Sequence, residues 1–125
     1  MIILIVDDRE DGRYLLEALL KGNGYEVESA GNGRDALGKL RAGRVDLIIS
    51  DILMPIMDGF EFCQTVKSDA ALGNIPFIFY TATYTSSQDE AFALKLGADL
   101  FLRKPCEPEE LLVKIQGVIR KEALP

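Results

Sequence analysis

The chain has 125 residues, a length that suits one domain and leaves little room for a second. It carries 14 basic and 20 acidic residues, and the resulting net charge of −6 disfavours nucleic-acid binding by charge alone. No apolar run approaches the ~20 residues of a membrane span. We therefore expect no direct contact with nucleic acid or with a membrane.

The sequence contains no histidine. This excludes a Ser–His–Asp triad, a Cys–His dyad, a histidine-bearing metal site and a phosphohistidine carrier. The two cysteines, Cys63 and Cys106, form no CxxC motif, which predicts free thiols in a reducing cytoplasm. Any chemistry must use carboxylates, hydroxyls and lysine.

Apolar segments alternate with helical patterns along the chain. The first, residues 2–6, is a continuous apolar run, as expected for a strand that is covered on both faces. Leucines at helical spacing follow it, and a glycine-containing turn ends that helix. The predicted strands span residues 2–6, 25–30, 45–50, 76–80 and 99–102, and apolar helical stripes follow them at 15–20, 33–40, 59–67, 88–96 and 111–119.

This alternation predicts a single doubly wound (βα)5 domain of the α/β class over residues 1–125. Its five-stranded sheet should be parallel, with right-handed crossovers. Ligands of such sheets bind at the carboxyl ends of the strands, so function depends on the residues found there.

Four of the five predicted strands end in reactive side chains, whereas the second ends in Ala30 and Gly31. Three carboxylates, one hydroxyl and one ammonium should therefore gather at one edge of the sheet. These residues are Asp7 and Asp8 after the first strand, Asp51 after the third, Thr81 after the fourth, and Lys104 with Pro105 after the fifth.

A single aspartate at a strand end often only caps a helix. Three converging acids are different, because two carboxylates ~4 Å apart repel by ~4 kcal/mol at an effective dielectric constant of 20. Lys104 supplies one compensating charge, and a hard divalent cation such as Mg²⁺ would supply the rest. Such a set can form an aspartyl phosphate, with Lys104 and Thr81 stabilising the oxygens of the transferred group.

Four motifs give the chain a close family resemblance over nearly its whole length. They are residues 5–8 (IVDD), residues 49–55 (ISDILMP) with Asp58 and Gly59, Thr81–Ala82, and Lys104–Pro105. In this order and at these strand ends, they are similar to bacterial two-component response-regulator receiver domains. The resemblance implies a flavodoxin-like sheet with strand order 2-1-3-4-5.

The resemblance also implies a metal site and a phosphoacceptor. Asp51 would accept the phosphoryl group. Asp8 and Asp51 would ligate Mg²⁺ through their side chains and Leu53 through its carbonyl, while Asp7 would act through a metal-bound water. Mn²⁺ would be able to replace Mg²⁺.

Further roles follow from the same family. Lys104 would pair with Asp51 and later with its phosphate, and Thr81 would move toward the phosphoryl group. Phe101 stands at the position of the family's aromatic switch residue and would rotate into the space that Thr81 leaves. The peptide bond before Pro105 would be cis.

The implied function is a phosphorylation-dependent signalling switch and not an enzyme, beyond catalysis of its own phosphotransfer and autodephosphorylation. The phosphoryl group would come from the phosphohistidine of a sensor histidine kinase or phosphotransfer protein, or from a small donor. Met57, Phe60 and the first helix would meet that partner. The output, an unknown domain or target protein, would respond to the face formed by the fourth helix, fifth strand and fifth helix.

Three other functions remain as alternatives. Residues 31–36 match GxGxxA, a dinucleotide-binding pattern, but that fingerprint belongs in the first βα unit, and a turn with Asn32 as N-cap explains it more simply. A Mg²⁺ phosphatase would place an acid two positions after its nucleophile, where this chain has Leu53. A flavodoxin-like FMN protein would need a phosphate-binding loop where Asp7 and Asp8 stand.

Overall fold

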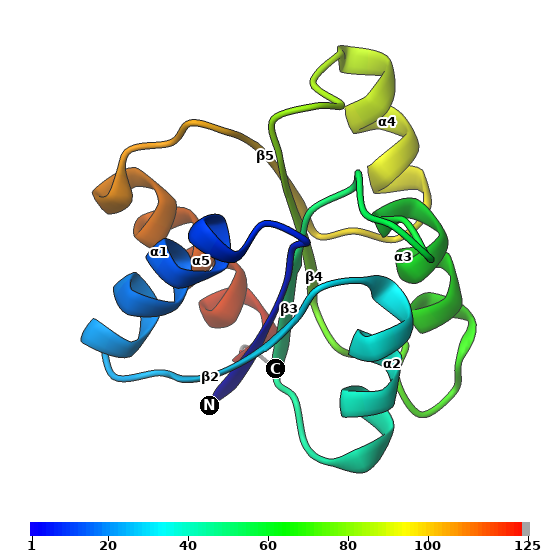
Figure 1. The fold of residues 1–125 in the computed structure, drawn as a ribbon, viewed down its shortest axis with the longest axis horizontal. Coiled ribbons are helices and arrows are strands. Elements are labelled where there is room, and N and C mark those ends of the chain that lie inside the picture. Colours follow the sequence, from blue (N-terminus) through cyan, green and yellow to red (C-terminus); the bar gives the residue numbers. More distant parts are fainter. Residues whose placement is uncertain (124–125) are drawn as a thin grey trace.

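The computed structural model describes residues 1–123, in which five strands alternate with five helices (Figure 1). The predicted domain runs to residue 125, and residues 124–125 lie outside the described residues. The elements are β1 (Ile2–Val6), α1 (Glu10–Gly22), β2 (Glu26–Ala30), α2 (Gly33–Ala42), β3 (Leu47–Ser50), α3 (Gly59–Ser68), β4 (Phe77–Thr81), α4 (Ser87–Lys95), β5 (Leu100–Arg103) and α5 (Pro108–Ala123).

The strands form one parallel sheet in the order β2-β1-β3-β4-β5, so the predicted fold class and strand order are confirmed. Helices α1 and α5 cover one face, and α2, α3 and α4 cover the other (Figure 1). Within the described residues, no helix has both the length and the apolar character needed to cross a membrane.

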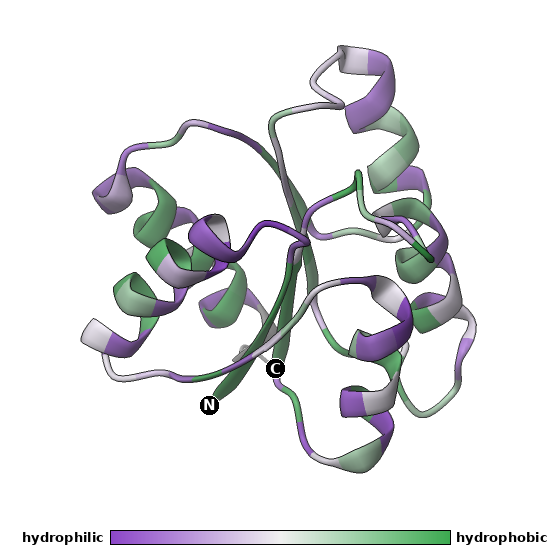
Figure 2. Ribbon diagram, viewed as in Figure 1, coloured by the Kyte–Doolittle hydropathy of each residue, from purple (hydrophilic) through white to green (hydrophobic). Residues whose placement is uncertain are grey.

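The apolar runs of the central strands fill two cores, one on each face of the sheet. Along β1, Ile3 and Ile5 pack with α1 and α5, while Leu4 and Val6 pack with the helices of the opposite face. A strand whose two faces are both covered has no polar side, which explains why β1 reads as a continuous run. The hydropathy colouring shows the same pattern, with a hydrophobic sheet between amphipathic helices (Figure 2).

The structure shifts the ends of two predicted strands by one residue, to include Thr81 in β4 and Arg103 in β5. These two residues pair with each other across the sheet. The prediction relied on apolar runs, and it ended both strands one residue early because the side chains at these positions are polar. Both lie at the carboxyl edge, where a polar side chain can serve a site.

The GxGxxA motif has a packing role at the start of α2. Asn32 caps the helix, as predicted, by accepting a hydrogen bond from the backbone N–H of Asp35 at 2.9 Å. A Cβ atom at Gly33 would lie 2.8 Å from Cβ of Phe62 and 2.9 Å from Cγ of Met57. Gly33 thus allows α2 to approach the loop between β3 and α3 closely.

Two glycines of α2 should respond oppositely to replacement by alanine. Gly33→Ala forces a Cβ against Phe62 and Met57 and should lower the free energy of unfolding by about 1–3 kcal/mol. Gly38 has no neighbour within 4 Å of the added Cβ, so Gly38→Ala should raise it by about 0.5–1 kcal/mol through helix propensity. Urea unfolding of both variants checks this, and equal effects would contradict the packing role of Gly33.

Candidate functional site

Backbone hydrogen bonds of the sheet place the predicted site residues at one edge. The backbone N–H of Asp51 donates to the carbonyl of Val6 at 2.8 Å, and that of Asp7 donates to the carbonyl of Ala30 at 3.0 Å. On the other side, the N–H of Lys104 donates to the carbonyl of Thr81 at 2.8 Å. The first residues beyond β1, β3 and β5 therefore remain in register with the sheet.

The ammonium of Lys104 joins two buried carboxylates. Its Nζ atom lies 2.8 Å from Oδ2 of Asp7 and 3.1 Å from Oδ2 of Asp51, and these aspartates are only 5% and 9% exposed. Burial lowers the pKa of Lys104, but the hydrogen bond to Asp7 and the charges of Asp51 and Asp7 outweigh it. The pKa of Lys104 is thereby raised above its ordinary value, so the ammonium stays charged.

Each of these two carboxylates also accepts a backbone N–H on its other oxygen. Oδ1 of Asp51 accepts from Ile52 at 2.6 Å, and Oδ1 of Asp7 accepts from Arg9 at 2.9 Å. The acidic loop after β1 is held further by Arg13, whose Nη1 donates to the carbonyl of Asp7 at 2.6 Å. Both carboxylates are therefore fixed in orientation before any ligand binds.

Asp8 does not join this cluster, although three gathered carboxylates were predicted. Its side chain is exposed, while Asp7 and Asp51 share the single cation. Within residues 1–123, no group of three or more histidine, cysteine or acidic residues is arranged to hold a metal ion. Repulsion among the acids gives the physical reason, because one ammonium already serves two carboxylates and a third is better solvated.

The donor chemistry at this edge nonetheless fits Mg²⁺. The side chains of Asp7, Asp8 and Asp51 and the carbonyl of Leu53 offer only oxygen, and Mg²⁺ takes oxygen ligands while keeping several waters. Asp8 is exposed, so its carboxylate is accessible to a hydrated ion. The donor types at this edge are thus compatible with Mg²⁺.

Thr81 lies on β4, next to β3, and its side chain is fully buried. Its Oγ1 lies 3.2 Å from the backbone nitrogen of Thr83 and 3.4 Å from that of Tyr84, and it accepts their hydrogen bonds. A hydroxyl can accept and donate together, so its proton can still be given to another oxygen. Thr81 therefore links the site edge to the loop between β4 and α4.

Phe101, which stands at the position of the family's aromatic switch residue, is buried. Its side chain is 5% exposed, and its ring centroid lies 6.4 Å from that of the buried Phe79. The aromatic residue is thus already inward in this structure. The peptide bond between Lys104 and Pro105 is cis, the isomer that the family resemblance implies.

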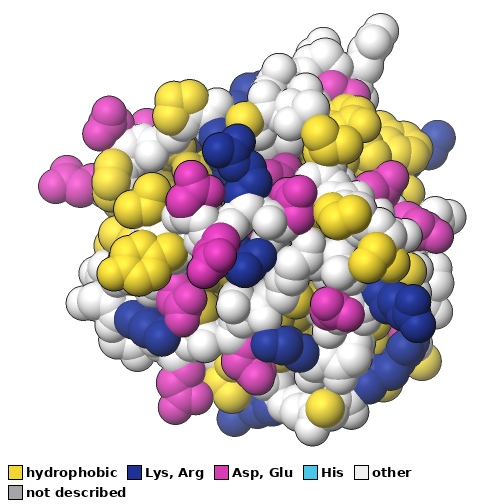
Figure 3. Space-filling model, viewed as in Figure 1, with side chains coloured by type: hydrophobic (Ala, Val, Ile, Leu, Met, Phe, Trp, Pro, Cys, Tyr) yellow, Lys and Arg dark blue, Asp and Glu magenta, His cyan; other side chains and the backbone are white. Residues whose placement is uncertain are grey.

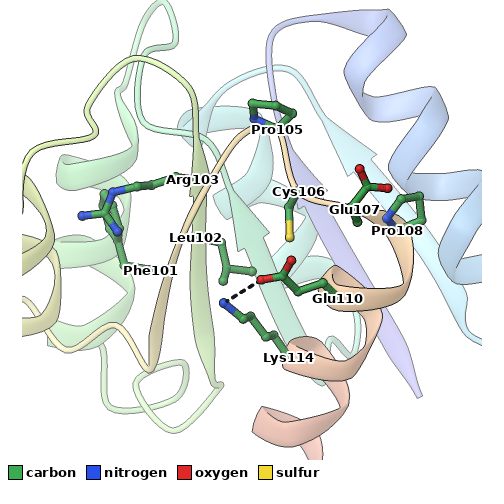
Figure 4. Close-up of a pocket in the computed structure, with 9 residues that line it drawn as sticks. All are labelled: Phe101, Leu102, Arg103, Pro105, Cys106, Glu107, Pro108, Glu110 and Lys114. Carbon is green, nitrogen blue, oxygen red and sulfur yellow. Dashed lines mark ion pairs between the residues drawn. The ribbon is translucent and has the colours of Figure 1, made fainter.

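A hollow of about 490 Å³ lies beside the end of β5 (Figure 4). Cys106 points into it from the segment that leads to α5, and burial raises the pKa of its thiol. Burial raises the pKa of Cys63, in the core, to about 12. Both residues are free cysteines, as predicted, and both thiols remain protonated near neutral pH.

Comparisons with known proteins agree with this fold and site. The sequence profile described as "Response regulator receiver domain" matches residues 3–116. The transcriptional regulatory protein GltR of Pseudomonas aeruginosa is 38% identical over 119 residues, covering 95% of this chain and 49% of GltR. The alkaline phosphatase synthesis transcriptional regulatory protein PhoP of Bacillus subtilis is 33% identical, covering 98% of this chain and 50% of PhoP.

Solved structures give the same result. The signal receiver domain of a signal transduction histidine kinase from Syntrophus aciditrophicus has a TM-score of 0.89 and 36% identity, covering 99% of this chain and 93% of that one. The chemotaxis response regulator CheY4 of Vibrio cholerae has a TM-score of 0.86 and 39% identity, covering 94% and 97%.

An acidic edge on a 2-1-3-4-5 parallel sheet, with a lysine between two aspartates, defines a phosphoryl-accepting switch domain. The chain belongs to the response-regulator receiver domain family, and its role is regulatory. It spans about half the length of the curated relatives it matches.

The structure adds three residues that the sequence motifs did not identify. Arg13 supports the acidic loop, and it could have been suspected only from its place one helical turn into α1. Gly12 leaves space for Asp7, because a Cβ there would lie 3.0 Å from Oδ2 of that residue. Arg103 contacts Phe101, and nothing in its sequence context signals this contact.

Removal of the central cation should destabilise the fold. Lys104→Met leaves Asp7 and Asp51 buried beside each other without compensation, and the free energy of unfolding should fall by about 3 kcal/mol. Lys114→Met is the control, because its ion pair with Glu110 is exposed and should contribute little. Urea unfolding at neutral pH measures both, and an unchanged stability of Lys104→Met would contradict the central role of the ammonium.

Proposed function

We propose that Asp51 accepts the phosphoryl group in a reaction that requires Mg²⁺. The observation that carries this assignment is the buried carboxylate of Asp51 at the end of the central strand, with Oδ2 3.1 Å from Nζ of Lys104. Phosphorylation of Asp51 adds negative charge next to its carboxylate. Lys104 is placed to balance that charge, and the hydroxyl of Thr81 comes from the neighbouring strand.

The other two acids suit supporting roles. Oδ2 of Asp7 forms an ion pair with Lys104 at 2.8 Å, and its Oδ1 accepts a hydrogen bond from the backbone N–H of Arg9. Both carboxylate oxygens of Asp7, which follows β1, therefore already have partners. Asp8 is exposed and lies apart from the ammonium. Side-chain ligation by Asp8 and Asp51, carbonyl ligation by Leu53 and a water-mediated contact from Asp7 would hold the metal.

The bound Mg²⁺, or Mn²⁺ in its place, would supply positive charge to the oxygens of the transferring group. The chain's own residues orient the reaction. The N–H of Ile52 fixes one oxygen of Asp51, Lys104 binds the other, and Thr81 offers a hydroxyl proton. Since phosphoryl transfer depends mainly on position and electrostatics, the domain needs no further catalytic group for its own phosphotransfer and autodephosphorylation.

The phosphodonor would be a sensor histidine kinase or phosphotransfer protein, or a small acyl phosphate. The exposed apolar residues next to the site form the proposed donor-docking surface, which consists of Tyr14 and Leu15 on α1 and Leu53 and Ile56 on the loop between β3 and α3. The space-filling view shows hydrophobic side chains over α1 beside charged side chains in the middle of this face (Figure 3). Exposed apolar residues that form a contiguous patch mark contact sites.

Two residues predicted to meet the donor, Met57 and Phe60, are only partly exposed. Met57 is half-buried against Gly33, and Phe60 is half-buried among aromatic rings. Ile56, between Pro55 and Met57, is instead 72% exposed. We therefore assign donor contact on this loop to Ile56 and Leu53.

Ile56 occupies a strained turn. Its φ angle is 70°, and the N–H of Met57 donates to the carbonyl of Pro55 at 2.7 Å, which closes a three-residue turn around Ile56. A β-branched residue rarely adopts a positive φ angle. A strained, exposed and apolar residue beside the phosphoacceptor fits a role in partner contact, because glycine would suit the backbone better.

The phosphoacceptor can be tested by intact-mass measurement. Wild-type protein incubated with acetyl phosphate and Mg²⁺ should gain the mass of one phosphoryl group, and Asp51→Asn should gain none. Omission of Mg²⁺ should abolish the gain, and Asp8→Ala should reduce it by about tenfold or more because a metal ligand is lost. A phosphorylated Asp51→Asn protein would refute the assignment.

The docking role of Ile56 predicts opposite effects on stability and on transfer. Ile56→Gly should raise the free energy of unfolding by about 0.5–1 kcal/mol, because the strain of a positive φ angle is relieved. The same variant should slow transfer from a sensor kinase, chosen by screening a kinase panel against the wild type, while labelling by acetyl phosphate stays unchanged. Val113→Ala, which shortens an exposed apolar side chain on α5, serves as the control. Alanine is used at this position because glycine would destabilise the helix. Equal kinase transfer to wild type and Ile56→Gly would exclude the docking role.

A further inference from the structure

Arg103, the last residue of β5, contacts three separate parts of the domain. Its Nε donates to the carbonyl of Thr85 at 2.9 Å, and its Nη2 donates to Oε1 of Glu90 at 2.8 Å. Its guanidinium carbon lies 5.1 Å from the centre of the Phe101 ring. One side chain therefore joins the loop between β4 and α4, the first turns of α4, and the aromatic residue of β5.

The ring of Phe101 contacts both an aromatic ring and a guanidinium group. The aromatic neighbour is Phe79, which itself contacts the rings of Phe77 and Phe60. The guanidinium belongs to Arg103, and the close-up shows the side chains of Phe101 and Arg103 next to each other, on the side of β5 away from Cys106 (Figure 4). A guanidinium over an aromatic face is attractive and shields the ring from water.

Arg103 also fixes the loop that begins at Thr81. The loop is anchored at its start, where Oγ1 of Thr81 accepts hydrogen bonds from the backbone N–H groups of Thr83 and Tyr84. It is anchored at its end, where Arg103 binds the carbonyl of Thr85. Since Thr81 and Arg103 are paired across the sheet, both anchors belong to one rigid pair of strands.

We propose that Arg103 is a positioning residue that keeps Phe101 inward and the β4–α4 loop in place independently of a phosphoryl group. The aromatic residue of this domain then takes its inward conformation before any phosphoryl group is bound. The two ring contacts described for Phe101, with Phe79 and with Arg103, come from residues outside the Asp7–Asp51–Lys104 cluster, so neither contact depends on occupancy of that cluster. The consequence for signalling rests on the proposed role of Asp51.

An inward ring in the unphosphorylated protein affects the affinity for a phosphoryl mimic. A ligand that binds one conformation loses apparent affinity in proportion to the fraction of molecules in the other conformation. Arg103 keeps the inward fraction high, so a phosphoryl mimic at Asp51 binds without first moving the ring. Only the planar fork of arginine can bind a carbonyl, a carboxylate and a ring face together, so lysine is a poor substitute.

The position of the ring can be measured without any ligand. In protein with ¹³C-labelled phenylalanine, free of Mg²⁺ and phosphodonor, a soluble paramagnetic agent should broaden the Phe101 ring signal strongly in Arg103→Ala and weakly in wild type. Arg103→Lys should fall between them. Arg41→Ala, which removes the ion pair between Arg41 on α2 and Asp69 at the end of α3, should resemble the wild type.

The mimic beryllofluoride, added with Mg²⁺, then tests the link to the site. The wild-type Phe101 signal should change little, whereas the Arg103→Ala signal should move back to the wild-type position. The apparent dissociation constant for beryllofluoride should rise about two- to tenfold in Arg103→Ala, as expected for the loss of exposed ion-pair and cation–π contacts. Arg41→Ala should bind as the wild type does.

Several results would overturn the proposal. A Phe101 ring that is accessible to the agent in wild type, or equally protected in Arg103→Ala, would show that Arg103 does not hold it. Tighter beryllofluoride binding by Arg103→Ala would show that Arg103 opposes the switch. Failure of the Asp51 assignment would look different, because wild type and Asp51→Asn would then respond alike to beryllofluoride while the ligand-free measurement still reported on Arg103.

Discussion

The ammonium of Lys104 between Asp7 and Asp51 is the interaction on which the rest of the structure depends. Two carboxylates exposed to water by less than a tenth would repel each other strongly without a cation between them. The three residues come from three different strands, so the ammonium also ties the carboxyl edge of the sheet together. The charge that stabilises the fold is the same charge that a phosphoryl group would need.

This arrangement separates the three acids by their exposure to water. Asp7 and Asp51 are buried and oriented by backbone N–H groups, whereas Asp8 remains in solvent. Buried and fixed groups cost little reorganisation when charge develops beside them, which favours transfer chemistry. An exposed carboxylate exchanges partners easily, which suits a ligand for a hydrated cation.

Strands β4 and β5 connect the acidic edge of the sheet to the loop between β4 and α4. Thr81 and Arg103 pair across these strands, and each holds one end of the same loop. Lys104 follows Arg103 directly, so the residue that binds the two aspartates adjoins the residue that contacts α4. The buried ring of Phe101 contacts Arg103 and connects it to the aromatic core around Phe79.

The sequence by itself determined the fold class, the strand order implied by the family motifs, and the identity of the reactive strand ends. Apolar runs and helical stripes are local patterns, and the carboxyl ends of parallel strands necessarily meet. The sequence also identified Asn32 as a helix cap, because capping depends on the residues immediately around it.

Only the tertiary structure decided which charges meet and which stay apart. Lys104 contacts Asp7 and Asp51, 97 and 53 positions away in the sequence, and Asp8 was left in solvent although it adjoins Asp7. The burial of Phe101 under Arg103 and the positive φ angle of Ile56 were equally hidden. These features depend on the directions of side chains and on contacts between distant elements, and a residue pattern records neither.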